Sequence, residues 1–156
     1  MIDHYTRLED ALAVGRCPTD EERPWLAQQG ITGLLTLQSD ADLHHRDIDW
    51  VRWTAEYSTL GIEAVRVAVT DFDRADLLNN LDAAVASLHR LVEKGRRVYV
   101  HCNAGINRSP STVIGYLVAH RGLDLDAATA QVMSVHRPCY PYPDVMASWV
   151  LRRCGP

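Results

Sequence analysis

The sequence contains no long apolar run and no apolar leader. The first ten residues, MIDHYTRLED, are polar from the start, whereas a signal peptide needs an apolar core. No apolar stretch approaches the roughly 20 residues of a membrane-spanning helix. These absences predict a soluble, cytoplasmic protein that does not engage a membrane.

The chain also lacks a strong charge of either sign and any metal-binding cysteine pattern. Its formal net charge is -4, which gives no general attraction to nucleic acid. The four cysteines are widely spaced and form no CxxC pair, so neither a zinc knuckle nor a disulfide framework is expected. The segment DADLHHRD, with His44 and His45, is typical of a solvated loop. We expect no metal and no cofactor.

No internal repeat, linker or low-complexity segment interrupts the 156 residues, 47% of which are hydrophobic. This length allows one buried core, so we expect a single domain over residues 1–156, without a carbohydrate-binding module and acting as a monomer. Apolar runs predict strands over residues 12–14, 31–37, 62–69 and 97–101. Helical spacing and punctuation predict a short helix from about Arg23, after a Thr19–Glu22 capping box, and helices over 76–94, 110–121, 126–136 and 144–153.

Strands that alternate with helices predict an α/β fold: a mixed, largely parallel sheet of about four or five strands with helices on both faces. In such sheets, ligands bind beyond the carboxyl ends of the strands, where helix N-termini present free N–H groups. The stretch VYVHCNAGINRSPS fits this position, since it joins a strand to a helix through a loop of small residues. We therefore expect an anion site there.

Each residue type in this loop suits phosphate chemistry. Cys102 would be a thiolate nucleophile, because positive potential favours ionisation of a thiol. Arg108 offers a planar fork for two phosphate oxygens, and Ser109 is placed to donate a hydrogen bond to the sulfur. Backbone amides between Cys102 and Arg108 would cradle the anion; the loop residues are Asn103, Ala104, Gly105, Ile106 and Asn107.

The string HCNAGINRS resembles the HCxxGxxRS motif of the protein tyrosine phosphatase superfamily, and the short chain is similar to its dual-specificity branch. This resemblance implies hydrolysis of phosphomonoesters through a phosphocysteine, without a metal. It also implies an aspartate about thirty residues upstream as general acid. Asp71 fits that position best, with Asp73 as the alternative, whereas Asp76 reads as a charge at a helix N-terminus.

The flanking segments resemble the glucan phosphatases, namely laforin and the plant starch phosphatases. The similar segments are YTRLEDALAVGRC, LLTLQSDADL, TDFDRADL, EKGRRVYVHCNAG and HRPCYP. This resemblance implies a phosphorylated glucan as substrate and aromatic contacts for sugar at Phe72, Tyr140 and Tyr5.

The loop itself, AGINRSPS, is more similar to that of the protein-directed dual-specificity phosphatases. A phosphoprotein is therefore the second candidate substrate, and a catalytically weak phosphate-binding module is the third reading. The loop carries no lysine, which disfavours a highly charged phosphoinositide. Thr36 stands where some glucan phosphatases have a second cysteine, so that disulfide is not expected unless Cys17 or Cys139 lies near Cys102.

Overall fold

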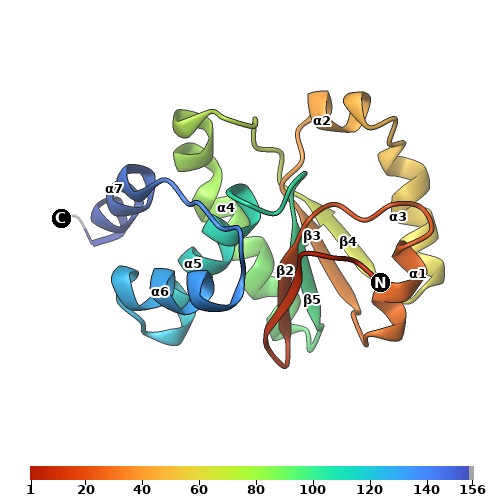
Figure 1. Ribbon diagram of the computed structural model, residues 1–156, viewed down its shortest axis with the longest axis horizontal. Helices are drawn as coiled ribbons and strands as arrows, with labels where there is room; N and C mark the ends of the chain where they lie inside the picture. Colours follow the sequence, from red (N-terminus) through yellow and green to blue (C-terminus); the bar gives the residue numbers. More distant parts are fainter. Residues whose placement is uncertain (155–156) are drawn as a thin grey trace.

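A five-stranded sheet forms the centre of the molecule in the computed structural model, which describes residues 1–154 (Figure 1). The strands lie in the order β1-β2-β5-β3-β4; β1 is antiparallel to β2, and the other pairs are parallel. This confirms the predicted mixed, largely parallel sheet. The strands are β1 (Tyr5–Glu9), β2 (Leu12–Gly15), β3 (Gly33–Thr36), β4 (Glu63–Arg66) and β5 (Val98–His101).

Seven helices within the described residues cover both faces of the sheet. Figure 1 shows α4 to α7 on one face, α1 and α3 on the other, and α2 beyond one end of the strands. None of these helices combines the length and apolarity that a bilayer span needs. The helices are α1 (Arg23–Gln28), α2 (Asp40–His45), α3 (Trp50–Thr59), α4 (Arg74–Glu93), α5 (Arg108–Arg121), α6 (Leu125–Val135) and α7 (Pro143–Cys154).

Because side chains alternate along the strands, the sheet has a hydrophobic core on each of its two faces. Val98 and Val100 of β5 pack on the side of α4 and α5, whereas Tyr99 between them packs with Trp53 and Tyr57 of α3. Successive strand side chains point to opposite faces, and both faces are buried here. This is why the central strands read as continuous apolar runs.

Most helix ends lie where glycine or capping residues in the sequence predict them. Gly122 ends α5 in the left-handed conformation (φ 72°), and Gly95 follows α4 with φ 82°. The helix α1 begins at Arg23, as predicted. Only half of the expected capping box forms: the Glu22 carboxylate accepts a hydrogen bond from the Thr19 amide, but Glu22 itself is the N-cap and no side chain caps it.

Three elements were not predicted from the sequence: β1, α2 and α3. The strand β1 lies at the sheet edge and is only partly buried, so its polar residues produce no apolar run. The helix α2 has only six residues. The helix α3 buries Trp53 and Tyr57, which lie four residues apart on one face. Two buried aromatics give too weak a periodicity to predict a helix.

Candidate active site

Cys102 lies at the centre of the edge where the parallel strands end. It follows β5, which pairs with β2 on one side and β3 on the other, and α5 begins six residues later at Arg108. The Cys102 side chain is buried, with 3% of the residue exposed. The strand, loop and helix thus meet as the sequence predicts, and the helix N-terminus faces the loop.

The carbonyl groups of the loop all point outward to donors in the surrounding protein. The Asn103 oxygen accepts from the Cys17 amide (3.0 Å), and the Ile106 oxygen accepts from the Tyr140 amide (2.8 Å). Three histidine rings contact the other carbonyls: His101 Nδ1 lies 3.0 Å from the Cys102 oxygen, His4 Nδ1 3.0 Å from that of Ala104, and His136 Nε2 2.7 Å from that of Gly105.

The amides of the loop are correspondingly free. Within residues 1–154, none of the backbone N–H groups from Asn103 to Arg108 donates a hydrogen bond. In a trans peptide the C=O and the following N–H point in opposite directions, so outward carbonyls leave inward amides. The loop is therefore a ring of donors of the kind that binds an anion.

Gly105 is required by the geometry of this loop. Its φ is 73°, and a Cβ atom built on it would lie 2.6 Å from the carbonyl oxygen of Gly15. Both facts exclude a side chain, because L residues avoid positive φ and no non-bonded carbon approaches an oxygen so closely. Close packing against the end of β2 thus fixes the loop.

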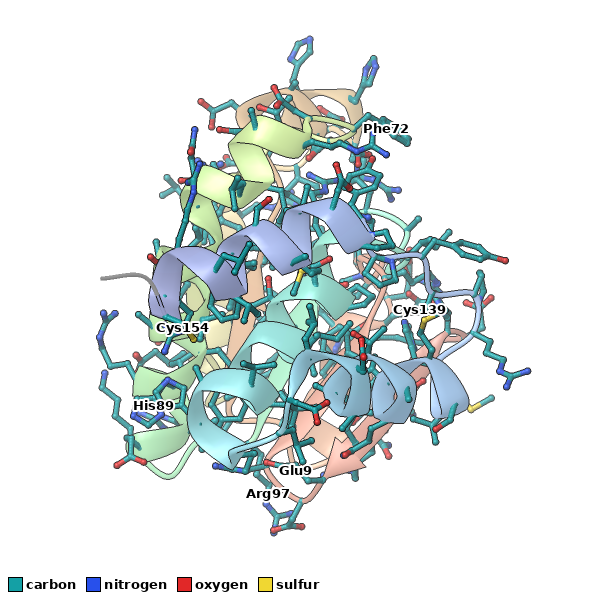
Figure 2. The ribbon with its side chains drawn as sticks, turned by 90° about the vertical axis from the view of Figure 1, so that its left-hand side faces the viewer. Glu9, Phe72, His89, Arg97, Cys139 and Cys154 are labelled. Carbon is teal, nitrogen blue, oxygen red and sulfur yellow. The ribbon has the colours of Figure 1, made fainter. Side chains whose placement is uncertain are left out.

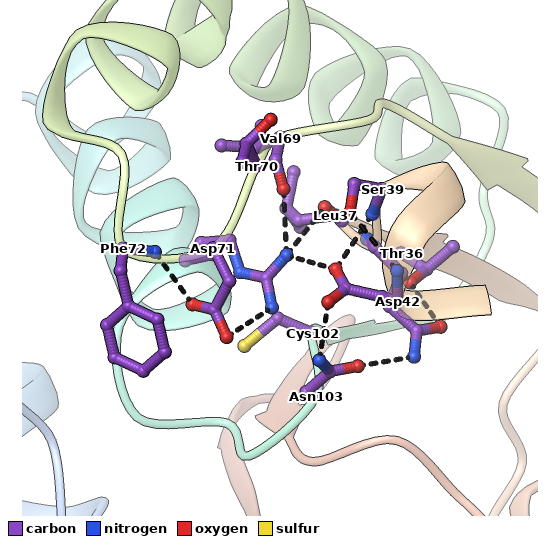
Figure 3. Close-up of polar contacts among 12 residues, drawn as sticks. Thr36, Leu37, Ser39, Asp42, Val69, Thr70, Asp71, Phe72, Cys102 and Asn103 are labelled. Atoms are coloured by element: carbon purple, nitrogen blue, oxygen red, sulfur yellow. Dashed lines mark hydrogen bonds and ion pairs between the residues drawn. The ribbon is translucent and has the colours of Figure 1, made fainter. Parts of the chain in front are cut away.

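The Arg108 side chain is buried, and acceptors from α2 and from the loop after β4 hold its terminal nitrogens. Its buried guanidinium donates from Nη1 to Asp42 Oδ2 (2.6 Å) and to the Val69 carbonyl (2.7 Å), and Nη2 lies 3.2 Å from Asp71 Oδ2 (Figure 3). Nε is buried and has no partner among the described residues. A buried donor without a partner is costly, so an anion in the loop would satisfy it.

Asp42 is a site residue that sequence reasoning missed. Its carboxylate accepts from Arg108, from Asn103 Nδ2 (2.7 Å) and from the Ser39 amide (2.9 Å), and the last bond is half of a capping box at the start of α2. Burial alone would raise the pKa of Asp42, but the bonds from Arg108 and Ser39 hold the pKa below its ordinary value. The S-x-x-D pattern could have located the helix start, but nothing local points to Arg108.

The structure separates the three aspartates that follow β4. Asp71 faces Arg108, whereas Asp73 is the N-cap of α4 and accepts the Asp76 amide (2.9 Å). Asp76 lies in the first helical turn, as expected, and accepts the Thr70 amide (2.7 Å). Only Asp71 has a contact to the phosphate loop.

Ser109 and His101 both contact Cys102, the first at its sulfur and the second at its carbonyl oxygen. Ser109 Oγ donates to the Gly15 carbonyl (3.1 Å) and lies 3.3 Å from Cys102 Sγ, a contact in which either atom can be the donor. His101 is fully buried, and this burial lowers its pKa to about 4. Its neutral ring therefore donates to the Cys102 carbonyl.

Of the three expected sugar contacts, two lie beside the loop. Phe72 directly follows Asp71 and is 87% exposed, and Figure 2 shows its ring at the edge of the molecule. Tyr140 is 66% exposed, and its carbonyl accepts from Asn107 Nδ2 (2.8 Å). Tyr5 differs: its ring is partly buried and packs on Trp25 of α1 and on the core residue Tyr99.

The remaining cysteines are free thiols. Cys17 lies beside the loop, where its amide bonds to Asn103, and Cys139 precedes Tyr140. Burial raises the pKa of both thiols to about 11, which keeps them protonated at neutral pH. Cys154 is exposed in the last turn of α7, well away from Phe72 in Figure 2.

Metal-ligating side chains do not converge in the described part of the chain. Residues 1–154 contain no group of three or more His, Cys, Asp or Glu side chains that could hold an ion. His44 and His45 are exposed in the last turn of α2.

This arrangement is the one expected of a cysteine-dependent phosphatase domain, and the comparison with known families agrees. The model of the dual specificity phosphatase catalytic domain matches residues 14–147, so the chain belongs to this family.

Relatives with different substrates share this domain. The amyloplastic phosphoglucan phosphatase DSP4 of Castanea sativa is 31% identical over 149 residues, which cover 93% of this chain and 39% of that protein. Phosphatidylglycerophosphate phosphatase PTPMT1 of Arabidopsis thaliana is 28% identical, over 84% of this chain and 37% of that protein. The chain thus spans less than half the length of either relative.

A solved structure shows the same fold. The crystal structure of PTPMT1 in complex with PI(5)P superposes with a TM-score of 0.80 at 21% identity, over 98% of this chain and 100% of that one.

Proposed function

We propose that the chain hydrolyses phosphomonoesters in two steps on Cys102. In the first step the Cys102 thiolate attacks phosphorus, the bond to the leaving oxygen breaks, and Asp71 donates a proton to that oxygen. The loop amides and Arg108 stabilise the charge on the phosphoryl oxygens. The supporting observation is that Asp71, which follows β4, contacts Arg108 at the end of the loop that begins with Cys102 (Figure 3).

In the second step water attacks the phosphocysteine, and the Asp71 carboxylate takes a proton from it. The P–S bond breaks, and inorganic phosphate and the Cys102 thiolate are released. The Ser109 hydroxyl, 3.3 Å from the sulfur, then donates to the departing thiolate. Such a bond makes sulfur a better leaving group without changing how substrate binds.

Phosphorylated glucan is the substrate that we propose. Phe72 and Tyr140 expose large apolar rings on two separate segments beside the loop. Exposed aromatic faces of this kind are costly in water but stack well on the apolar face of a sugar ring. The similarity to DSP4 agrees with this choice.

A phosphoprotein is the second candidate, because one observation favours it. A hollow of about 490 Å³ adjoins Tyr140 between α6 and α7, and its walls include Leu125, Met133 and Met146. An apolar side chain near a phosphorylated residue would fit it. No such hollow is needed for a sugar chain.

Relative rates would decide between these substrates. Phosphate release from a phosphorylated glucan, from phosphotyrosine and phosphothreonine peptides and from a phosphatidylglycerophosphate-type lipid would each be divided by the rate on a small aryl phosphate. We expect the glucan to exceed the others by at least about tenfold, or 1.4 kcal/mol. A peptide or lipid that wins by that margin would refute the glucan proposal.

Variants of the two aromatics supply the structural test. We expect Phe72→Ala and Tyr140→Ala each to lower the ratio of glucan rate to aryl phosphate rate. Leu151→Ala is the matched control, because Leu151 is an apolar residue on α7 whose exposure (72%) lies between those of Phe72 and Tyr140. A ratio that falls no more in Phe72→Ala than in Leu151→Ala would contradict a sugar contact.

A further inference from the structure

His4 joins the phosphate loop to the segment after α6. Its Nδ1 lies 3.0 Å from the Ala104 carbonyl oxygen, and its Nε2 lies 2.9 Å from the Pro138 carbonyl oxygen. These two partners are 34 residues apart in the chain and both about a hundred or more from His4. The ring is therefore the bridge between the loop and the segment that carries Tyr140.

Both of these bonds require protonated nitrogen atoms. A carbonyl oxygen only accepts hydrogen bonds, and a neutral imidazole has one N–H group. A neutral His4 could therefore satisfy only one of its two partners. The complete bridge needs the imidazolium form, with a proton on each nitrogen.

His136, whose ring stacks on that of His4, has hydrogen-bond partners that suit a neutral imidazole. Its ring lies 4.0 Å from that of His4 with 11° between the planes. Its Nε2 contacts the Gly105 carbonyl, and its Nδ1 lies 2.7 Å from Thr6 Oγ1, whose hydroxyl can donate to it. Burial lowers the pKa of His136, and so does the nearby charge of His4. A neutral His136 can stack on a protonated His4 without repulsion between like charges.

The other charged and titratable groups near His4 are accounted for. Asp3, its chain neighbour, pairs with Arg16 at the end of β2. Arg137, before Pro138, donates to the Met133 carbonyl on α6. The remaining titratable groups next to His4 and its partners in the chain are the Tyr5 phenol, which accepts a hydrogen bond from Arg7, and the buried thiols of Cys102 and Cys139.

The backbone of His4 is held in an unfavourable conformation. Its φ is 56°, a left-handed value that non-glycine residues adopt rarely and at a cost. The carbonyl of His4 also packs tightly over Gly15, where a Cβ atom would overlap it. Such strain persists only where surrounding contacts impose it, and here those contacts are the two ring bonds and the packing on β2.

We propose that His4, as an imidazolium, is a positioning residue for the phosphate loop. By holding the Ala104 carbonyl outward it turns the Gly105 amide inward, because both groups belong to one planar peptide. When His4 loses a proton, one of its two bonds is lost and the loop binds phosphate less well. This inference rests on the phosphatase site alone and is independent of the glucan proposal.

The test compares phosphate binding across pH. The inhibition constant of inorganic phosphate and kcat/KM for an aryl phosphate would be measured from about pH 5.5 to 8.5, the range in which histidines titrate. The variant His4→Asn tolerates positive φ but cannot reach both carbonyls. His45→Ala is the control, since His45 is an exposed histidine on α2.

We expect His4→Asn to weaken phosphate binding about tenfold at pH 5.5 and less than twofold at pH 8.5, while His45→Ala follows the parent protein throughout. A merely structural role would lower binding equally at every pH. A ratio that does not change with pH, or a variant that binds like the parent, would overturn the proposal.

A spectroscopic measurement keeps the proposal testable if His4→Asn folds poorly. The ¹⁵N shifts of the His4 ring in the parent protein report whether both nitrogens carry protons. We expect the imidazolium signature at pH 5.5, and its loss should shift the Gly105 amide resonance in step. A neutral His4 ring at pH 5.5 would refute the proposed bridge. A Gly105 amide resonance that does not shift when the His4 ring loses its proton would refute it as well.

Discussion

Replacing Asp42 by Asn tests whether α2 positions the arginine of the site. The change preserves shape but removes the charge that faces Arg108 Nη1 at 2.6 Å, and it sets an NH₂ group against either Arg108 or Asn103. Hydrogen bonds to charged groups contribute about 1.5–3 kcal/mol each. Because Asp71 still pairs with Arg108, we take the lower part of this range, about 2 kcal/mol.

We expect Asp42→Asn to lower the free energy of unfolding in urea by about 2 kcal/mol. A misplaced guanidinium should also lower kcat/KM for an aryl phosphate by at least about tenfold, with weaker inhibition by inorganic phosphate. Asp40→Asn is the matched control, because Asp40 is two residues away on the same helix with its side chain 90% exposed. Equal stability and activity in the two variants would refute the reasoning.

Three further variants probe the loop and its surroundings. Asp71→Asn should reduce turnover of an aryl phosphate at least about a hundredfold, whereas Asp73→Asn should leave kcat and stability nearly unchanged, because asparagine caps a helix about as well as aspartate; the reverse order of kcat values would assign the acid to Asp73. Gly105→Ala should abolish turnover, since its methyl group would overlap Gly15; a variant with normal kcat would contradict this fit. The unfolded chain takes up a proton on His101 before the folded protein does, so the free energy of unfolding should fall by about 3 kcal/mol from pH 6.5 to pH 4. Urea titrations should show that His101→Gln loses this part of the pH dependence, and an unchanged dependence would exclude His101 as its source.

The central part of the fold was predictable because burial on both sides leaves a strong local pattern. The runs around Val14, Leu35 and Val100 have no polar alternation, and each ends at the edge that carries the site. The motif from Cys102 to Ser109 was equally clear, since its residue types act together within a few positions. Such patterns indicate only the roles of residues that lie close together in the sequence.

The contacts that orient the loop come instead from residues far away in the chain. Asp42 reaches Arg108 across 66 positions, and His4 reaches Ala104 across 100. Asp42 resembles any capping aspartate in an acidic segment, and His4 lies in a polar N-terminus without periodicity. Their roles depend on which strand ends meet at one edge of the sheet, and that is a property of the order β1-β2-β5-β3-β4. A linear sequence therefore indicates the residues that do the chemistry more readily than those that hold them in place.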